Sequence, residues 1–313
     1  MLKIVRAFAP ATIANINCGF DILGMALEKP GDEVIVKRIP DIGIKLNCFS
    51  SCKSLSNDPE KNCITIPIIH FLKHINLYDK IGIEVELIKK LPLGSGMGSS
   101  AASSVAGVFA VNHILGEPLK REELMPFILE GEAYACGSAH ADNAAPSLLG
   151  GIKLVRSYIP LDIIEITYPD KLHVVLIHPD MRIDTITARE LMPKAIPMNI
   201  FVKQTGNLAG LITGLMRSDD DLIIRSLEDF VAEPVRKTLI PFFDSVKAAA
   251  MGSGALGFGI SGSGPSLFAL CSSISVAECC SFAVAKYLND LSIKHQIYVS
   301  KISSQGALIL EEE

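Results

Sequence analysis

The chain has 313 residues, a formal net charge of −5 at pH 7, 49% hydrophobic residues and 20% charged residues. This length and composition predict a folded protein with a sizeable core and room for two domains, and they exclude a disordered chain. The negative net charge, without a basic stripe, argues against nucleic acid as a partner. No signal-peptide pattern and no apolar run of about 18 residues is present, so we expect a cytoplasmic protein without a membrane partner.

Alternating and helical patterns of apolar residues predict the elements of the first half. Strands are expected over residues 3–9, 33–38, 43–49, 82–88 and 150–155. Helices are expected over residues 64–75, from 99 to about 115, and over 121–135. A glycine-rich stretch separates the strand over 82–88 from the helix that starts at residue 99.

Proline-containing turns between residues 157 and 170 predict a boundary, which divides the chain into domains 1–160 and 161–313. In the second half we expect strands over 172–177, 256–261, 266–271 and 296–301, and helices over 199–216, 220–230, 235–250 and 275–288. That order approximates a split βαβ pattern, an antiparallel sheet with helices on one face. The fold class expected for the whole chain is therefore α+β.

The most informative segment is residues 92–105, in which Gly94, Gly96 and Gly98 alternate before Ser99 and Ser100. A glycine-rich loop that enters a helix N-terminus presents backbone N–H groups and a positive dipole end to an anion, so a triphosphate is the expected ligand. No lysine follows the glycines as a P-loop requires, and Ser99 stands where a dinucleotide loop has glycine. The alternative is a flexible loop capped by serine onto a core helix.

A second glycine-rich stretch, residues 257–266, lies between two predicted strands. It could be a second backbone surface that closes on a ligand between the two domains. The alternative is a tight turn with a bulge, for which glycine is equally suited.

Three segments together, residues 9–21, 92–105 and 257–266, resemble the three motifs of the GHMP small-molecule kinase superfamily. Residues 131–143, 187–193 and 233–241 are similar to the homoserine kinase group of that superfamily. The resemblance spans nearly the whole chain. It departs at Asn17-Cys18, where the group usually has Gly-Pro, and at Met97, a volume-conserving change from Leu.

This resemblance implies an N-terminal half like domain 2 of ribosomal protein S5 and a C-terminal ferredoxin-like half. It also implies an ATP-dependent transferase, a kinase that phosphorylates L-homoserine to O-phospho-L-homoserine in threonine biosynthesis, and assembly as a homodimer. The alternatives are another GHMP kinase of the mevalonate type, whose substrate carries no ammonium group, or a non-catalytic sensor of the same fold.

The resemblance further implies that ATP and Mg²⁺ bind at the first glycine loop. The expected ATP-binding residues are Asn62 and the loop residues Pro92, Leu93, Gly94, Ser95, Gly96, Met97, Gly98, Ser99, Ser100, Ala101 and Ala102. Asn62 would contact the adenine, or alternatively cap the next helix. Ser99 and Glu132 would hold Mg²⁺, which prefers few hard oxygen ligands; a solvated carboxylate is the alternative for Glu132.

The acceptor is a zwitterion with a reacting hydroxyl, and the resemblance assigns each of its groups to residues of this chain. Arg189 and Arg236 would bind the carboxylate, for which a guanidinium is well shaped; each alone could equally be a surface residue. The remaining acceptor-binding residues expected are Asn15, Asp21, His140, Asn143 and Gly262. Asp21 could instead be a turn or cap residue, and His140 a structural one.

The acceptor of the hydroxyl proton is left open between two neighbouring residues. We favour Asn143 as the residue that orients the hydroxyl, with the proton passing to the γ-phosphate, and keep Asp142 as the rival general base. The expected catalytic set is therefore Asn143, Ser99, Glu132 and Asp142.

Overall fold

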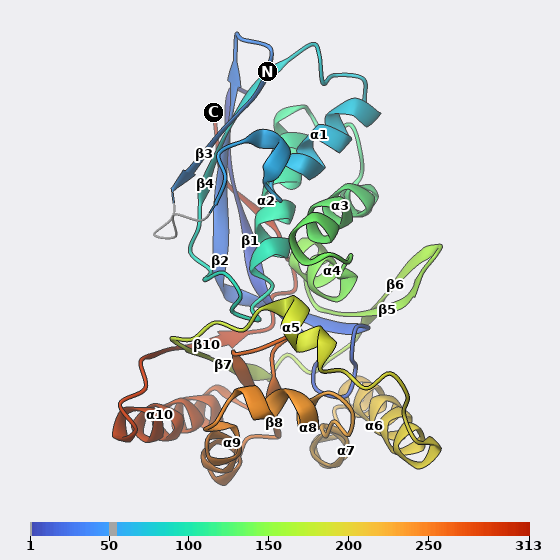
Figure 1. Cartoon of the computed structure of the whole chain (residues 1–313), viewed down its shortest axis with the longest axis vertical. Coiled ribbons are helices and arrows are strands. Elements are labelled where there is room, and N and C mark those ends of the chain that lie inside the picture. Colours follow the sequence, from blue (N-terminus) through green and yellow to red (C-terminus); the bar gives the residue numbers. More distant parts are fainter. Residues whose placement is uncertain (1, 50–54) are drawn as a thin grey trace.

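The computed structural model describes residues 2–49 and 55–313. Within these ranges the chain forms two stacked parts, each built on one sheet (Figure 1). The upper part in that view combines a seven-stranded sheet with α1 to α4, and the lower part combines a four-stranded sheet with α5 to α10. The expected α+β class is confirmed.

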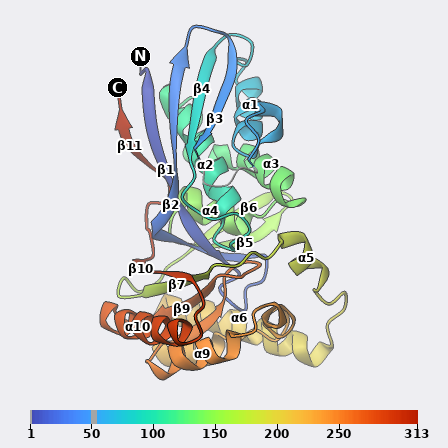
Figure 2. The same ribbon diagram turned by 60° about the vertical axis from the view of Figure 1, so that its left-hand side comes forward.

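The larger sheet has the strand order β11-β1-β2-β4-β3, and β5 and β6 continue it from the start of β2. All its pairings are antiparallel except β3 with β4. Strands β1 and β11 lie side by side although they are far apart in sequence (Figure 2). The strand bounds are β1 Ile4–Ala14, β2 Leu23–Ile39, β3 Gly43–Phe49, β4 Gly82–Ile88, β5 Ile152–Tyr158, β6 Leu161–Ile166 and β11 Leu308–Glu312.

Helix α2 occupies the centre of the upper part, in contact with β1, β2 and the three other helices. Its sequence is almost entirely small or apolar, and nearly every residue is buried. Gly107 lets α1 approach closely, because a Cβ there would lie 2.6 Å from Cγ1 of Ile64. The helices are α1 Thr65–His74, α2 Ser99–Ile114, α3 Met125–Cys136 and α4 Ala141–Leu149, with 3-10 turns at Pro59–Lys61 and Arg121–Leu124.

The smaller sheet is antiparallel in the order β10-β7-β9-β8. With helices between β7 and β8 and between β9 and β10, it has the β-α-β-β-α-β connectivity of a ferredoxin-like half. Its strands are β7 His173–Pro179, β8 Gly257–Ile260, β9 Leu267–Cys271 and β10 His295–Lys301. Its helices are α5 Thr185–Glu190, α6 Met198–Arg217, α7 Asp220–Ser226, α8 Glu233–Arg236, α9 Phe243–Gly252 and α10 Ile274–Asp290, with a 3-10 turn at Lys237–Leu239.

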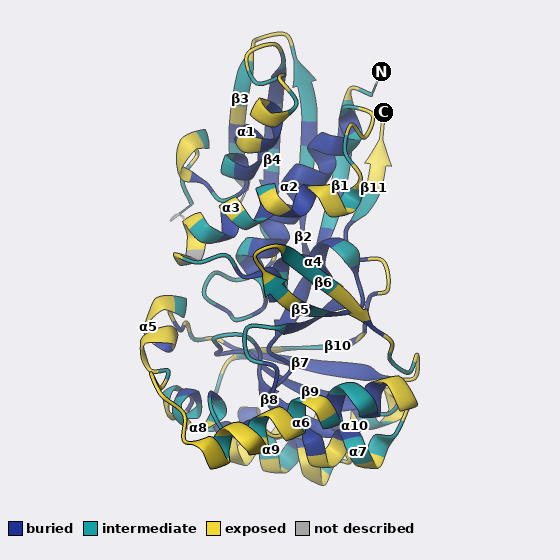
Figure 3. Ribbon diagram, turned by 90° about the vertical axis from the view of Figure 1, so that its right-hand side faces the viewer, coloured by how far each residue is buried: buried dark blue, intermediate teal, exposed yellow. Residues whose placement is uncertain are grey.

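Strand β7 is buried on both faces, so its alternate residues enter two different cores. Val175 and Ile177 pack in the core that contains residues of α9 and α10. Val174 and Leu176 belong to the large core that also fills the space beneath the seven-stranded sheet. Strand β7 and helix α2 are accordingly dark in the burial colouring, while much of α5 and α6 is exposed (Figure 3). No helix in the described part of the chain is both long and apolar enough to cross a bilayer.

Several elements differ from the sequence expectation. The expected helix over 235–250 is wrong as a single element, because the chain breaks at Ile240 and Pro241 between α8 and α9. Helices α4 and α5 and strands β6 and β11 were not expected. Strands β6 and β11 lie beyond residue 160 yet pair within the larger sheet, and the division into 1–160 and 161–313 stays a prediction.

Candidate active site

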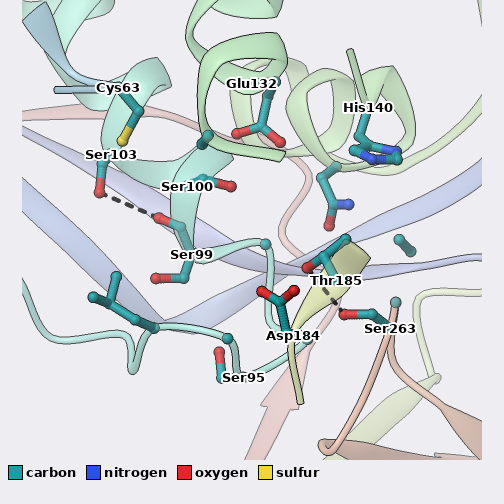
Figure 4. A pocket seen from close by; sticks show the side chains of 18 of the residues that line it. Cys63, Ser95, Ser99, Ser100, Ser103, Glu132, His140, Asp184, Thr185 and Ser263 are labelled. Atoms are coloured by element: carbon teal, nitrogen blue, oxygen red, sulfur yellow. Dashed lines mark hydrogen bonds between the residues drawn. The ribbon is translucent and has the colours of Figure 1, made fainter. Parts of the chain in front are cut away.

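A cavity of about 340 Å³ opens between the two parts of the molecule, at the N-terminal end of α2. Its walls come from both parts, as Figure 4 shows for a subset of the lining side chains. It brings together most of the residues expected from the sequence: Asn15, Asp21, Asn62, Leu93, Gly94, Ser95, Gly96, Gly98, Ser99, Ser100, Glu132, His140, Asp142, Asn143, Arg189, Arg236 and Gly262. Met97, Ala101 and Ala102 are instead fully buried in the core, and Pro92 is not part of the described lining.

The three glycines of the first loop all have left-handed backbone angles, with φ of 62° at Gly94, 75° at Gly96 and 66° at Gly98. Such angles strain other residues, which explains the alternating glycines. Gly98 is also the N-cap of α2, and a Cβ there would overlap Oγ1 of Thr12. The loop therefore ends at the N-terminus of α2, whose first residues line the cavity, and a helix N-terminus of this kind is suited to bind phosphate.

The second glycine loop packs directly on the first. Oγ of Ser261 donates to the carbonyl of Gly96 at 2.6 Å, and the N–H of Ser266 donates to the carbonyl of Ser95 at 3.1 Å. Gly262 and Ser263 line the cavity as well. The loop is therefore a tight turn that also lines the cavity, and its expected role as a ligand-binding surface stays a prediction.

A buried lysine, which the sequence analysis did not single out, supports the first turn of α2. Nζ of Lys89 forms an ion pair with Asp32 and donates to the carbonyl of Ser99 at 2.6 Å and to Oγ of Ser103 at 2.8 Å. The other oxygen of Asp32 accepts from two backbone N–H groups of the loop, those of residues 90 and 91, at 2.9 Å each. This fully bonded network fixes the loop relative to the helix it enters.

Glu132 projects from α3 toward the start of α2, and only 1% of it is exposed (Figure 4). Burial raises the pKa of its carboxyl to about 7, against an opposing hydrogen bond from Ser100. Its Oε1 has no hydrogen-bond partner within the described residues. A buried carboxylate oxygen without a partner, beside a hydroxyl and a phosphate-binding loop, is a donor set that fits Mg²⁺.

The two serines at the start of α2 have different partners. Ser100 is the hydroxyl that bonds Glu132, whereas Oγ of Ser99 donates to the carbonyl of Leu91 at 3.2 Å. The Mg²⁺ role expected for Ser99 stays a prediction. Ser100, and not Ser99, is the serine that hydrogen-bonds the carboxylate of Glu132.

Asn62 is bonded within its own turn. Its Nδ2 donates to the carbonyl of Ser56 at 2.7 Å, and its Oδ1 accepts from the N–H of Ile64 at 3.1 Å. Both ends of the amide are therefore used within the turn that precedes α1. The capping alternative is wrong, because the N-cap of α1 is Ile64 and no side chain among the described residues caps that helix. The adenine contact expected for this residue stays a prediction.

Two further lining residues are arginines that lie over the ring of Phe20. The guanidinium of Arg189 lies 5.9 Å from the ring centroid and forms an ion pair with Asp21. Arg236 lies 5.0 Å from the centroid and donates from Nη1 to the carbonyl of Gly262 at 2.8 Å. Burial lowers the pKa of Arg236, and its Nε is left without a hydrogen-bond partner in the described structure.

Asn143 lines the cavity beside Gly98. Thr12 donates from Oγ1 to its Oδ1 at 2.7 Å, which fixes the orientation of the amide. Its neighbour Asp142 is 2% exposed; burial, with the charge of Asp21 adding to it, raises the pKa of the carboxyl to about 7. Burial also lowers the pKa of His140, whose Nε2 is 3.0 Å from Oγ of Ser138.

Residues 15–21 form the loop that carries Asp21 into the cavity. Oδ1 of Asn15 accepts from the N–H of Asp21 at 3.0 Å, and its Nδ2 donates to the carbonyl of Gly262 at 3.1 Å. Asn17, one of the two departures from the resemblance, has φ of 62°, a conformation that asparagine tolerates better than most residues. Its Nδ2 bonds the carbonyls of Leu227 and Phe258 at 2.9 and 3.3 Å, so this departure ties the loop to the lower part.

The comparisons with known proteins agree with this arrangement. The sequence models described as GHMP kinases N terminal domain and GHMP kinases C terminal match residues 63–151 and 211–290. A homoserine kinase of Chlorobium phaeobacteroides is 46% identical over 320 residues, which cover 99% of this chain and 100% of that protein.

Solved structures give the same picture. The crystal structure of homoserine kinase from Cytophaga hutchinsonii is similar with a TM-score of 0.96 at 46% identity, over 99% of this chain and 98% of that one. Mevalonate kinase of Methanococcus jannaschii is similar with a TM-score of 0.72 over 96% of this chain and 98% of that one. Its identity of 17% shows a shared fold alone.

Proposed function

Because this chain belongs to the homoserine kinase family of the GHMP kinases, we propose that it transfers the γ-phosphoryl group of ATP to the hydroxyl of L-homoserine. The products are ADP and O-phospho-L-homoserine. The observation that carries this proposal is one cavity lined both by the glycine-rich loop and by charges of both signs, Arg236, Arg189 and Asp21. An amino-acid alcohol is an acceptor that these charges fit.

Phosphoryl transfer depends on position and charge stabilisation more than on covalent help. The N–H groups of the glycine loop and the first turn of α2 bind the phosphates, and the Lys89–Asp32 pair keeps that turn in place. Glu132 with Ser99 or Ser100 would hold Mg²⁺. When bound, Mg²⁺ neutralises charge on the phosphate oxygens.

These charged residues recognise the zwitterion group by group. Arg236 and Arg189 bind the carboxylate, since a planar guanidinium can contact both of its oxygens. Asp21 binds the ammonium, so its ion pair with Arg189 opens or is shared when the acceptor enters. Asn143, held by Thr12, orients the acceptor hydroxyl toward the first glycine loop. The proton of that hydroxyl passes to the transferred phosphate.

Asp142 remains the rival for the hydroxyl proton. Its carboxyl pKa of about 7 would suit a general base, and it lines the same cavity. Burial of a carboxyl among other acidic groups gives the same pKa without any catalytic role. Assembly as a homodimer and a cytoplasmic location, which the sequence analysis expects, stay predictions.

The direct test is ADP release from ATP with L-homoserine, L-threonine, L-serine and mevalonate as acceptors. We expect L-homoserine to be preferred by kcat/KM, and Arg236→Leu mainly to raise KM for L-homoserine. Preference for mevalonate would refute the ammonium site at Asp21 and favour the mevalonate-type alternative. Saturable binding of ATP and L-homoserine without ADP release would favour the non-catalytic sensor.

A further inference from the structure

The first glycine loop carries no lysine, so a side-chain cation that contacts a bound triphosphate would come from another segment of the chain. Among the cavity-lining cations of the described structure, Lys61, Lys89 and Arg189 are each paired with an aspartate, Asp58, Asp32 and Asp21 respectively. Arg236 is buried over Phe20. The remaining cation of the lining is Arg182.

Arg182 lies against the phosphate loop itself. A Cβ built on Gly94 would be 2.7 Å from Cγ and 2.9 Å from Nε of Arg182, so the side chain crosses directly over the α-carbon of the first loop glycine. Within residues 2–49 and 55–313, no hydrogen bond or ion pair engages its guanidinium. Arg182 is also exposed, so its guanidinium is accessible to a ligand in the cavity.

The backbone that carries Arg182 is fixed to the loop. Between β7 and α5, Ile183 is 7% exposed and packs in the lower core, and its N–H donates to the carbonyl of Gly94 at 3.3 Å. Residues on either side of an inward-facing residue in extended chain point the other way. Arg182 and Asp184 therefore both face the cavity, which both of them line.

We propose that Arg182 binds the phosphates of the nucleotide from the lower part of the molecule and supplies the charge that a loop lysine would otherwise supply. This assignment rests on the proposed use of ATP. A guanidinium offers several donors in one plane and suits phosphate oxygens well. Because Arg182 comes from the part of the chain that also carries Arg189, nucleotide and acceptor are bound by one connected segment, β7 to α5.

The test is nucleotide binding to the full chain, without acceptor, for wild type, Arg182→Ala, Arg182→Lys and Arg225→Ala. Arg225 is an exposed arginine on α7 outside the cavity lining and serves as the matched control. The probes are a non-hydrolysable ATP analogue with Mg²⁺, and adenosine in competition with a fluorescent ATP analogue. Loss of a charge-assisted hydrogen bond predicts about 10- to 100-fold weaker binding of the ATP analogue to Arg182→Ala.

The expected pattern is specific to phosphate. Adenosine should bind Arg182→Ala within twofold of wild type, Arg182→Lys should retain part of the affinity for the ATP analogue, and Arg225→Ala should match wild type. Binding of the ATP analogue to Arg182→Ala within twofold of wild type would overturn the assignment, and so would equal losses for adenosine and the analogue.

Turnover separates this inference from the proposed function. If the wild-type enzyme releases ADP with L-homoserine but Arg182→Ala binds the ATP analogue normally, only the role of Arg182 is refuted. Wild-type enzyme that binds the analogue through Arg182 but shows no turnover with L-homoserine refutes only the acceptor.

Discussion

Replacement of Gly98 by alanine should disrupt stability and turnover together. Gly98 has φ of 66° as the N-cap of α2, and an added Cβ would overlap Oγ1 of Thr12 and come within 2.8 Å of Oδ1 of Asn143. The substitution therefore both strains the loop and separates the two residues whose hydrogen bond fixes the amide that orients the acceptor.

The expected magnitude follows from three contributions. A left-handed backbone costs a non-glycine residue about 1–2 kcal/mol. Overpacking of a filled site costs about 1–3 kcal/mol, and loss of the Thr12–Asn143 hydrogen bond about 0.5–1.5 kcal/mol. Together they predict a decrease of roughly 2.5–6.5 kcal/mol in the free energy of unfolding. Misplacement of Asn143 by about 1 Å would lower kcat about 100-fold.

The matched control lies at the other end of the same helix. Gly116 follows α2 with φ of 82°, and an added Cβ would meet nothing within 4 Å. Gly116→Ala should therefore show the backbone strain alone, about 1–2 kcal/mol, with kcat unchanged. Guanidinium unfolding and steady-state ADP release on both variants measure the difference.

If Gly98→Ala were no less stable than Gly116→Ala and kept wild-type kcat, the steric reasoning about the Thr12–Asn143 pair would be refuted. A loss of stability with normal kcat in the folded fraction would refute only the role of that pair in orienting the acceptor.

Three further outcomes are expected. Asp142→Asn should keep kcat within about 10-fold of wild type and leave the pH profile between 6 and 8 unchanged, whereas loss of a general base would lower kcat about 10²- to 10⁴-fold. Ser100→Ala removes a hydrogen bond that lowers the pKa of Glu132, so this pKa should rise further and protons should compete better with Mg²⁺ for the carboxylate. The Mg²⁺ concentration for half-maximal activity should therefore rise, more at pH 6.5 than at pH 8.5. An unchanged Mg²⁺ dependence of activity would contradict this. His113 contacts Glu312 at 2.6 Å and Glu117 at 2.9 Å; burial lowers the pKa of its imidazole, but these two carboxylates raise it more, so the pKa is raised in the folded state. Wild type should therefore be more stable than His113→Gln by about 0.2–1 kcal/mol at pH values below the unfolded-state pKa of about 6.5. This difference in the free energy of unfolding should disappear as the pH rises through the raised pKa of the folded state. A difference that grew with pH would contradict the assignment.

Local pattern was enough for elements whose neighbours are close in sequence. The strands over 43–49 and 82–88 are confirmed at the same residues, and the second of them alternates between buried and half-buried residues along most of its length. Strand β11 escaped notice because most of its residues are exposed and its partner is β1, so no alternation marks it. Helix α5 has only six residues and one buried side chain, too few for a helical period to be visible.

The first glycine loop was recognisable from the sequence because its backbone angles require glycine. The Lys89–Asp32 pair that supports it was not recognisable. Lys89 is followed by a second lysine and then by a Leu-Pro pair, a pattern typical of a solvated turn. Its burial is decided by Asp32, 57 residues earlier, on the neighbouring strand β2. Arg182 was missed for a similar reason, because only the tertiary fold places it over Gly94.

The pairing of β1 with β11 has a consequence for biosynthesis. Phe8 pairs with Leu308, so one side of β1 stays without its partner until about 300 further residues have left the ribosome. Until then β1 is an open edge with free N–H and C=O groups, the kind of surface that invites intermolecular association. Closure over so long a stretch is slow, and the nascent chain has to complete its smaller sheet before the larger one can be finished.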